Sequence, residues 1–306
     1  MLALLSQMPA AWVALAGLVG LLVGSFLNVV IHRLPIMLDR QWREQCTELD
    51  APVAELPPGP APAAVEPYNL VVPRSACPAC RAPIKSWQNI PILSWLWLRG
   101  KCAHCNAPIS LRYPLIELLC AVLSAAVAWR FGFGWTAGAA LAVTWTLIAL
   151  TGIDLDTQLL PDALTLPLLW GGLLASLAAS PGAGSSGGAS LPVSPAAAIT
   201  GAAAGYLCLW AVYQLFRLCT GKEGMGYGDF KLLAALGAWL GWHMLLPIIL
   251  CSASVGAVVG IALILSGRRG RGVPIPFGPF LAAAGWLAMM WGPQWVSVYL
   301  GLYGRG

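Results

Sequence analysis

Two aspartates at the edges of apolar segments could do chemistry together. Asp229 follows three glycines in residues 224–229 (GMGYGD), directly before a long apolar run. Glycines let the backbone adopt positive φ and approach a ligand or another helix closely. An acid at a membrane edge is by default a candidate functional residue. The competing interpretation is that Asp229 only caps the helix that follows.

A second acidic stretch, residues 152–162 (GIDLDTQLLPD), lies at another predicted membrane edge. If Asp154 and Asp229 lie at the same depth, the two carboxyl groups can share one proton, because like charges at close range cannot both be ionised. One ionised and one protonated carboxyl group can activate water for peptide hydrolysis. Which of the two would be the base is left open, since such a pair titrates as a unit.

Four of the nine cysteines form two CxxC pairs, Cys77 with Cys80 and Cys102 with Cys105. They bracket a segment rich in Trp and Pro. Two such turns can bind Zn²⁺ tetrahedrally through four thiolates. The sequence therefore predicts a structural zinc knuckle. The alternatives are a pair of disulfides or a redox CxxC, and we interpret His104 as a surface residue rather than a ligand.

The composition indicates how these residues are positioned. Hydrophobic residues make up 58% of the 306 residues and charged residues 9%, whereas a soluble domain carries roughly 25% charged residues. We therefore expect an all-α polytopic membrane protein of about eight transmembrane helices, and we interpret the net charge of +5 as a sign of topology rather than nucleic-acid binding. The expected spans are residues 10–31, 114–129, 135–153, 163–179, 195–216, two within 230–266 that meet near 241–243, and a last one that runs to about 291.

The chain divides by composition into three parts. Residues 1–34 form the first transmembrane helix, and residues 113–306 form the transmembrane core that carries both aspartates. Between them lies a cytoplasmic segment, residues 35–112. We expect it to contain a mobile linker at 35–73, where PPGPAP has linker composition, and the zinc knuckle at 74–110.

Basic residues set the predicted orientation. Of the 17 lysines and arginines, 15 lie in residues 32–112, 217–231 and 268–271. With eight spans these three segments share one side, which the positive-inside rule makes cytoplasmic, and both termini are then periplasmic. Asp154, Asp229 and the knuckle are all predicted on the cytoplasmic side. The two carboxyl groups can converge only if the third and fourth spans pack near the fifth and sixth.

Polar residues in the first two spans need partners. We expect Ser25 and Asn28 to bond to a neighbouring helix and Arg33 to anchor at the membrane interface. Glu117 lies one turn inside the second span, and its expected partner is Arg112 or a helix N-terminus. We interpret Glu117 as structural.

The motifs together resemble the type IV prepilin peptidases, which are bifunctional leader peptidase/N-methyltransferases, along nearly the whole chain. The resemblance rests on GSFLNVVIHRLP at 24–35, the CPAC and CAHC pairs around WQNIPILSWLWLRGKC, ISLRYPLIELL at 109–119, IDLDTQLLPD at 153–162, GMGYGDFKL at 224–232 and PIPFGPFLA at 274–282.

The resemblance implies a GxGD-type aspartic protease of the bacterial inner membrane, with the peptidase core in residues 113–306. Asp154 and Asp229 correspond to its catalytic aspartates. The residues that would support them are Gly226, Gly228, Lys231, Asp156 and Asp162. The implied substrates are prepilins or pseudopilins in the lipid bilayer, whose short basic leader is cut on the cytoplasmic side after a Gly. The resemblance also implies methylation of the new amino group by S-adenosylmethionine, for which no binding residues are identified.

Two other classes of function compete with this interpretation. A proton-coupled transporter would favour acids near mid-span and internal symmetry, whereas these acids lie at edges and no repeat is visible. A membrane thiol oxidoreductase would use a single CxxC, and both the doubled CxxC and its predicted cytoplasmic side argue against that.

Overall fold

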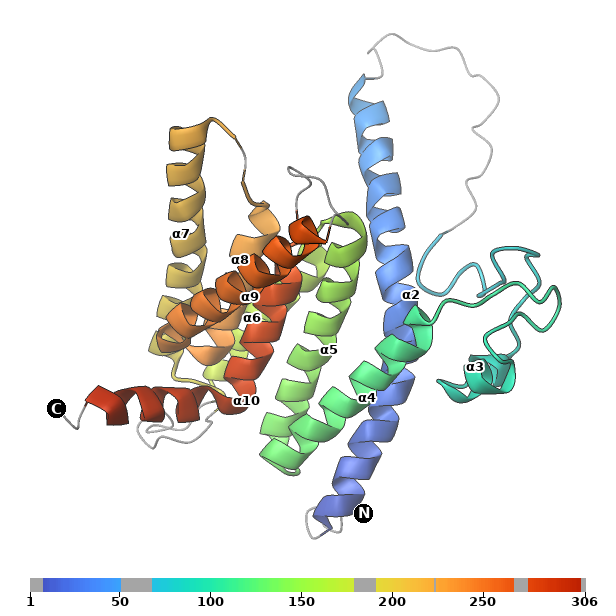
Figure 1. The fold of residues 1–306 in the computed structure, drawn as a ribbon, viewed down its shortest axis with the longest axis horizontal. Helices are drawn as coiled ribbons and strands as arrows, with labels where there is room; N and C mark the ends of the chain where they lie inside the picture. Colours follow the sequence, from blue (N-terminus) through green and yellow to red (C-terminus); the bar gives the residue numbers. More distant parts are fainter. Residues whose placement is uncertain (1–7, 51–67, 179–190, 223, 267–274, 304–306) are drawn as a thin grey trace. The chain divides into compact units, whose positions relative to one another are not determined.

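The computed structural model describes residues 8–50, 68–178, 191–222, 224–266 and 275–303. Within these ranges the chain is helical, with isolated β-bridges and no strand. The elements in chain order are α2 (Pro9–Asp50), η1 (Ser86–Asn89), α3 (Leu93–Trp97), α4 (Arg112–Phe131), α5 (Trp135–Thr157), α6 (Asp162–Ser176), α7 (Pro195–Thr220), α8 (Tyr227–Leu240), η2 (Trp242–Met244), α9 (Leu245–Leu265) and α10 (Gly278–Tyr303), as Figure 1 shows.

The helices confirm the predicted fold class. Each expected span overlaps one α-helix, and the break predicted at 241–243 is the short turn η2 between α8 and α9. Among the described residues, five helices are long and apolar enough to cross a membrane, namely α2, α4, α5, α7 and α9. The helices α6 and α8 have 15 and 14 residues, fewer than the roughly 20 that a bilayer core requires.

The chain forms two compact units. The first contains Met1–Gly17 and Leu123–Gly306, and the second contains Leu18–Val122. Their boundaries therefore fall within α2 and α4, whereas the sequence suggested divisions at 34 and 112. Both aspartates lie in the first unit and all four CxxC cysteines lie in the second.

Helix α8 is the centre of the first unit. Nearly all of its residues from Asp229 to Trp239 are buried, and it packs against α6, α7, α9 and α10 (Figure 1). It approaches α7 very closely, because a side chain at Gly201 or Gly237 would collide with the backbone of the other helix. This packing explains why α8 can be short: neighbouring helices rather than lipid surround it. It also fixes the helix that carries Asp229.

The predicted proximity of the aspartate-bearing spans is confirmed. Helix α6 contacts α5, α7 and α8, so the third and fourth spans pack near the fifth and sixth. Trp239 of α8 also donates a hydrogen bond of 2.8 Å from its indole nitrogen to the Leu168 carbonyl oxygen of α6. The helices α5 and α8, which carry the two acids, therefore share α6 as a neighbour.

The second unit joins α2 to α4. Gly24 lies directly against the backbone of Glu117, and the side-chain nitrogen of Asn28 donates a 3.1 Å hydrogen bond to the Tyr113 carbonyl. Ser25 hydrogen-bonds the Glu117 side chain. The expected bonds of Ser25 and Asn28 to a neighbouring helix are therefore present.

Arg33 differs from its expected role as an interface anchor. Its side chain is buried, and its guanidinium donates to the carbonyl oxygens of Asn69 and Pro73 at 2.9 and 2.7 Å. The guanidinium thereby ties the segment that precedes the knuckle to α2. Five donors in one planar group suit such binding of several carbonyls, and a partner 40 residues away cannot be inferred from local sequence.

The first part of the expected linker is also different. Helix α2 continues through Pro35 to Asp50, although the prediction ended it at Pro35. A proline inside a helix removes one hydrogen bond, but the residues that follow are mostly good helix formers. An ion pair of 3.0 Å between Asp39 and Arg43, one turn apart, adds support. Residues 51–67 of the expected linker and the basic segment at 268–271 lie outside the described residues.

Candidate functional site

Asp154 lies in the last turn of α5 and is only 4% exposed. Its Oδ2 accepts a 3.0 Å hydrogen bond from the backbone N–H of Gly278, the first residue of α10. A helix N-terminus favours a negative charge, because its first N–H groups lack partners within the helix. A methyl group at Gly278 would lie 2.6 Å from the same oxygen. The carboxyl group is therefore held by a backbone donor at a position where only glycine fits.

Asp229 lies in the first turn of α8 and is 7% exposed. The N-cap of this helix is Gly226, so Asp229 is not the cap that the competing interpretation required. Its carboxyl group interacts with the backbone N–H of Gly226. Its Oδ1 is buried and has no hydrogen-bond partner among the described residues. An unsatisfied buried polar atom typically destabilises a fold by about 1–3 kcal/mol, so it calls for a functional explanation.

One leucine connects the two aspartates. A methyl group at Gly228 would lie 2.6 Å from Leu160 Cβ, and one at Gly278 would lie 3.2 Å from Leu160 Cδ2. Leu160 thus fills the space between the glycine turn before Asp229 and the start of α10 that holds Asp154. The negative charges of the two aspartates are close enough to repel each other. The structure therefore brings the two predicted residues into one buried site.

An ion pair braces this site from the outside. Lys231 Nζ lies 2.6 and 2.7 Å from the two carboxylate oxygens of Asp162, and the side chains are 29% and 54% exposed. The pair joins the first turn of α8 to the first turn of α6, directly after the loop that carries Leu160. Asp156 is exposed and lies two residues beyond Asp154 on α5.

Sequence reasoning missed two members of the site. Gly278 belongs to the PIPFGPFLA motif, which was singled out without a role, and Leu160 lies within the acidic stretch. Neither residue can titrate, so a search for chemically active side chains passes over them. The available signal was that a glycine follows the predicted basic loop and precedes a span, where a backbone N–H would be free to bind an acid.

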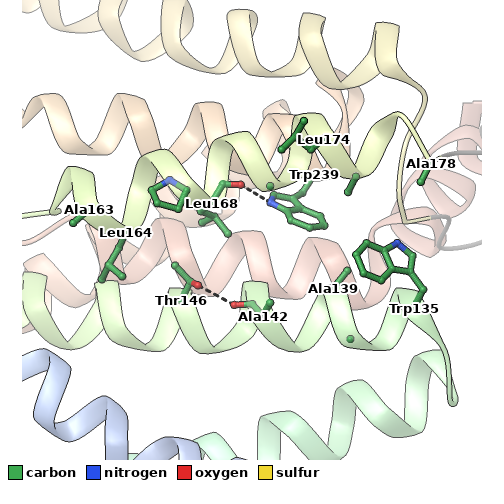
Figure 2. A pocket seen from close by; sticks show the side chains of 14 residues that line it. Trp135, Ala139, Ala142, Thr146, Ala163, Leu164, Leu168, Leu174, Ala178 and Trp239 are labelled. Carbon is green, nitrogen blue, oxygen red and sulfur yellow. Dashed lines mark hydrogen bonds between the residues drawn. The ribbon is translucent and has the colours of Figure 1, made fainter. Parts of the chain in front are cut away.

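An apolar cavity of about 540 Å³ lies between α5 and α6. Figure 2 shows Trp135, Ala139 and Ala142 on one side and Leu168, Leu174 and Trp239 on the other. Its lining includes no acidic, basic or cysteine side chain. The cavity therefore offers no carboxyl, imidazole, amine or thiol group for acid–base chemistry, in contrast to the site of the buried aspartates.

The four CxxC cysteines meet in the second unit. They are free thiols, and their sulfur atoms all lie within 4.8 Å of one another. The Sγ atoms of Cys77 and Cys105 are 3.8 Å apart. A zinc–sulfur bond of about 2.3 Å in a tetrahedron places neighbouring sulfurs about 3.8 Å apart. The donor set thus fits a tetrahedral zinc ion, and His104 lies outside it.

The two CxxC turns have the same backbone structure. Cys77 N–H donates to the Ala82 carbonyl at 3.0 Å, and Cys102 N–H donates to the Ala107 carbonyl at 2.8 Å. Each turn is followed by a residue with positive φ, Arg81 at 57° and Asn106 at 58°. The shared pattern CxxCxAP in the sequence is therefore a small local repeat.

Backbone donors in these turns favour the thiolate form that zinc requires. The N–H groups of Cys105 and His104 point at Cys102 and lower its pKa to about 6. The N–H groups of Cys80 and Ala79 likewise lower the pKa of Cys77. The knuckle thus presents two thiols that ionise more readily than a free cysteine.

Comparisons with known proteins find relatives along nearly the whole chain. A family model described as "Bacterial Peptidase A24 N-terminal domain" matches residues 18–131, and one described as "Type IV leader peptidase family" matches residues 141–261. A protein from Aeromonas hydrophila named "Prepilin leader peptidase/N-methyltransferase" is 55% identical over 300 residues, which covers 98% of each chain. Proteins with the same name from Stutzerimonas stutzeri and Pseudomonas aeruginosa are 54% and 52% identical, each over 97% of this chain and 96% of its own length. No solved structure matches the chain.

Proposed function

The chain belongs to the type IV leader peptidase family, and we propose that it is a membrane aspartic endopeptidase that uses Asp154 and Asp229 to remove the leader of prepilins. By analogy with the names of its relatives, it would then methylate the amino group that cleavage exposes. The observation that carries the proposal is the pair of buried carboxyl groups at helix ends, each held by a backbone N–H and one of them with a second, buried oxygen that lacks a partner among the described residues.

The hydrogen bonds suggest a division of roles. Asp154 accepts from the Gly278 N–H, which favours its ionised form. Asp229 also accepts from a backbone N–H, that of Gly226, but its Oδ1 is buried and has no donor in the described chain. Burying an unpaired charged oxygen is costly, so this carboxyl group is better suited to carry the shared proton. The ionised carboxylate would take a proton from water as the water oxygen attacks the scissile carbonyl, while the protonated one donates to the carbonyl oxygen. Collapse of the tetrahedral intermediate breaks the C–N bond, and the proton taken from water passes to the leaving amine.

The surrounding residues would position this pair. Gly228 allows the first turn of α8 to approach Leu160, Gly226 gives its backbone N–H to Asp229, and the Lys231–Asp162 ion pair holds α6 against α8. We propose that these residues and the nearby Asp156 support the site without touching the reacting atoms. A displacement of about 1 Å in such a site can reduce a rate by about 100-fold.

The placement in the cell extends the same proposal. The described helices support an integral membrane protein. The distribution of 15 of 17 basic residues supports an inner-membrane orientation with periplasmic termini, and with the aspartates and the knuckle on the cytoplasmic side. Prepilins or pseudopilins in the bilayer are the proposed substrates, and S-adenosylmethionine is the proposed methyl donor, with no residues assigned to it.

We further propose that Cys77, Cys80, Cys102 and Cys105 hold one structural zinc ion. The sulfur geometry supports this directly. The knuckle is too short to build a sufficient apolar core, so a metal cross-link would supply much of its folding free energy. A closed four-sulfur site leaves no open position, which favours a structural role over a catalytic one.

The direct test is a reconstituted cleavage assay. The purified chain in lipid nanodiscs is incubated with a full-length prepilin and S-adenosylmethionine in heavy-oxygen water, and the products are analysed by mass spectrometry. We expect a free leader with heavy oxygen in its new carboxyl group and a methylated pilin N-terminus. An uncleaved prepilin would overturn the peptidase proposal, and a cleaved but unmethylated product would overturn the methyltransferase part.

A further inference from the structure

The zinc knuckle carries an exposed apolar face on α3. Leu93, Leu96 and Trp97, which together we call the α3 face, are 61%, 58% and 80% exposed. Their spacing of three and four residues places them on the same side of the helix. Trp95 points elsewhere, because its indole nitrogen donates to the Ile109 carbonyl at 3.2 Å and its ring lies against Gly100. The knuckle therefore folds without using the α3 face.

The exposed charged residues in the sequence around this face are all basic, and the one nearby acid, Glu117, is buried. Residues 68–116 contain no aspartate or glutamate. The basic residues in this range are Arg74, Arg81, Lys85, Arg99, Lys101 and Arg112. Arg99 and Lys101 follow α3 directly, and both are exposed. Segments that lie in the interface of an anionic bilayer typically combine exposed tryptophan and leucine with neighbouring lysine and arginine.

A hydrogen bond to the buried Glu117 sets the depth of α3. The backbone N–H of Ile92, the N-cap of α3, donates to Glu117 Oε2 at 2.7 Å. This is the helix N-terminus that was one of the two expected partners of Glu117. Glu117 is five residues into α4, or about 7.5 Å along its axis at about 1.5 Å per residue. Gly24, within the apolar run of α2, lies against the same residue. The start of α3 is thus fixed to the level at which two membrane-length helices enter their apolar segments.

We propose that the α3 face inserts into the interface of an anionic phospholipid bilayer, with Arg99 and Lys101 at the lipid phosphates. Three exposed apolar side chains would otherwise contact water, and the position of α3 beside α4 brings them to the bilayer. The basic surroundings select an anionic lipid over a zwitterionic one. This surface depends on α2 and α4 crossing the membrane and does not depend on the peptidase activity.

Photo-crosslinking tests this contact in the intact, zinc-loaded chain. Benzoylphenylalanine is placed at Trp97, or as a matched control at Gln41, which is exposed on the extension of α2 beyond Arg33. The protein is illuminated in nanodiscs of phosphatidylglycerol or of phosphatidylcholine, and lipid adducts are quantified by mass spectrometry. We expect at least about threefold more lipid adduct from position 97 than from position 41, and more in phosphatidylglycerol than in phosphatidylcholine.

Two further variants separate the contributions. R99E combined with K101E should remove the preference for phosphatidylglycerol while zinc content is unchanged. In the chain without a photo-probe, W97F should lower the quenching of tryptophan fluorescence by brominated lipid. Adducts from position 97 to protein instead of lipid, whether within the chain, to a second copy or to a prepilin, would overturn the proposal. So would equal lipid adducts from positions 97 and 41, or unchanged quenching in W97F.

Discussion

Gly278→Ala is expected to disable peptide cleavage while the membrane fold stays intact. The added methyl group would lie 2.6 Å from Asp154 Oδ2 and 3.2 Å from Leu160 Cδ2. Since ordinary contact begins at 3.4 Å, the carboxyl oxygen or the start of α10 must move by about 0.8 Å. The 3.0 Å hydrogen bond from the Gly278 N–H would lengthen with it.

The size of this displacement sets the expected loss. A misplacement of about 1 Å in a catalytic site can reduce the rate by about 100-fold, equivalent to about 2.7 kcal/mol in the activation barrier. We therefore expect kcat for leader cleavage to fall by about 100-fold, with a smaller change in KM. Methylation of a pre-cleaved peptide should be little affected, because it needs no carboxyl pair.

The assay compares Gly278→Ala with Gly256→Ala in nanodiscs, with thermal unfolding as a check of folding. Gly256 lies in α9, and a methyl group there would contact Phe280 of α10 at an ordinary distance of 3.4 Å. This control should therefore keep kcat within about threefold. If Gly278→Ala cleaves as fast as Gly256→Ala, the contact between Asp154 and the start of α10 is not part of the active geometry. Equal loss in both variants would point to α10 packing instead.

Three other predictions concern the zinc, the second activity and the ion pair. Cys77→Ser should remove the bound zinc, as measured by metal analysis, and weaken both activities, whereas the control Cys46→Ser, at an exposed position of α2, should keep the zinc. Equal zinc in both variants, or a disulfide among the four cysteines, would contradict the zinc site. Asp229→Asn should still methylate a pre-cleaved pilin peptide while failing to generate one, and loss of that methylation in folded protein would show that the two sites are not separable. Asp162→Asn should reduce cleavage by less than about tenfold, because a partly exposed ion pair contributes about 1 kcal/mol or less; a loss as large as that of Asp154→Asn would mean that Asp162 takes part in the reaction.

The sequence was most informative where apolar length and cysteine spacing decide the structure. Hydropathy placed the spans, and the break at 241–243 followed from a run too long for one crossing. The CxxC spacing predicted the sulfur cluster that the structure contains. Two acidic membrane edges on the same predicted side indicated that an acid of residues 154–162 lies near Asp229, and the family resemblance singled out Asp154 among them.

Other features depend on contacts that local sequence does not encode. Arg33 binds carbonyl groups 36 and 40 residues away, and Gly278 reaches Asp154 across 124 residues. Local sequence predicts a helix end at Pro35, whereas α2 continues to Asp50, because a single proline removes only one backbone hydrogen bond. An acid within a span predicts that it has a hydrogen-bond partner, but the sequence does not identify that partner. The donor to Glu117, the N–H of Ile92, is defined by the packing of α3 beside α4.

The most direct test of the proposed catalytic pair is a mutant cycle of leader cleavage with Asp154→Asn, Asp229→Asn and the double variant, with Asp156→Asn as control. Each single change keeps the shape of the side chain but removes one carboxyl group, and should reduce cleavage by at least about 1,000-fold. The double variant should lose little more, because the two groups act as one unit. Full activity in Asp229→Asn, or an inactive Asp156→Asn beside an active Asp154→Asn, would contradict the account.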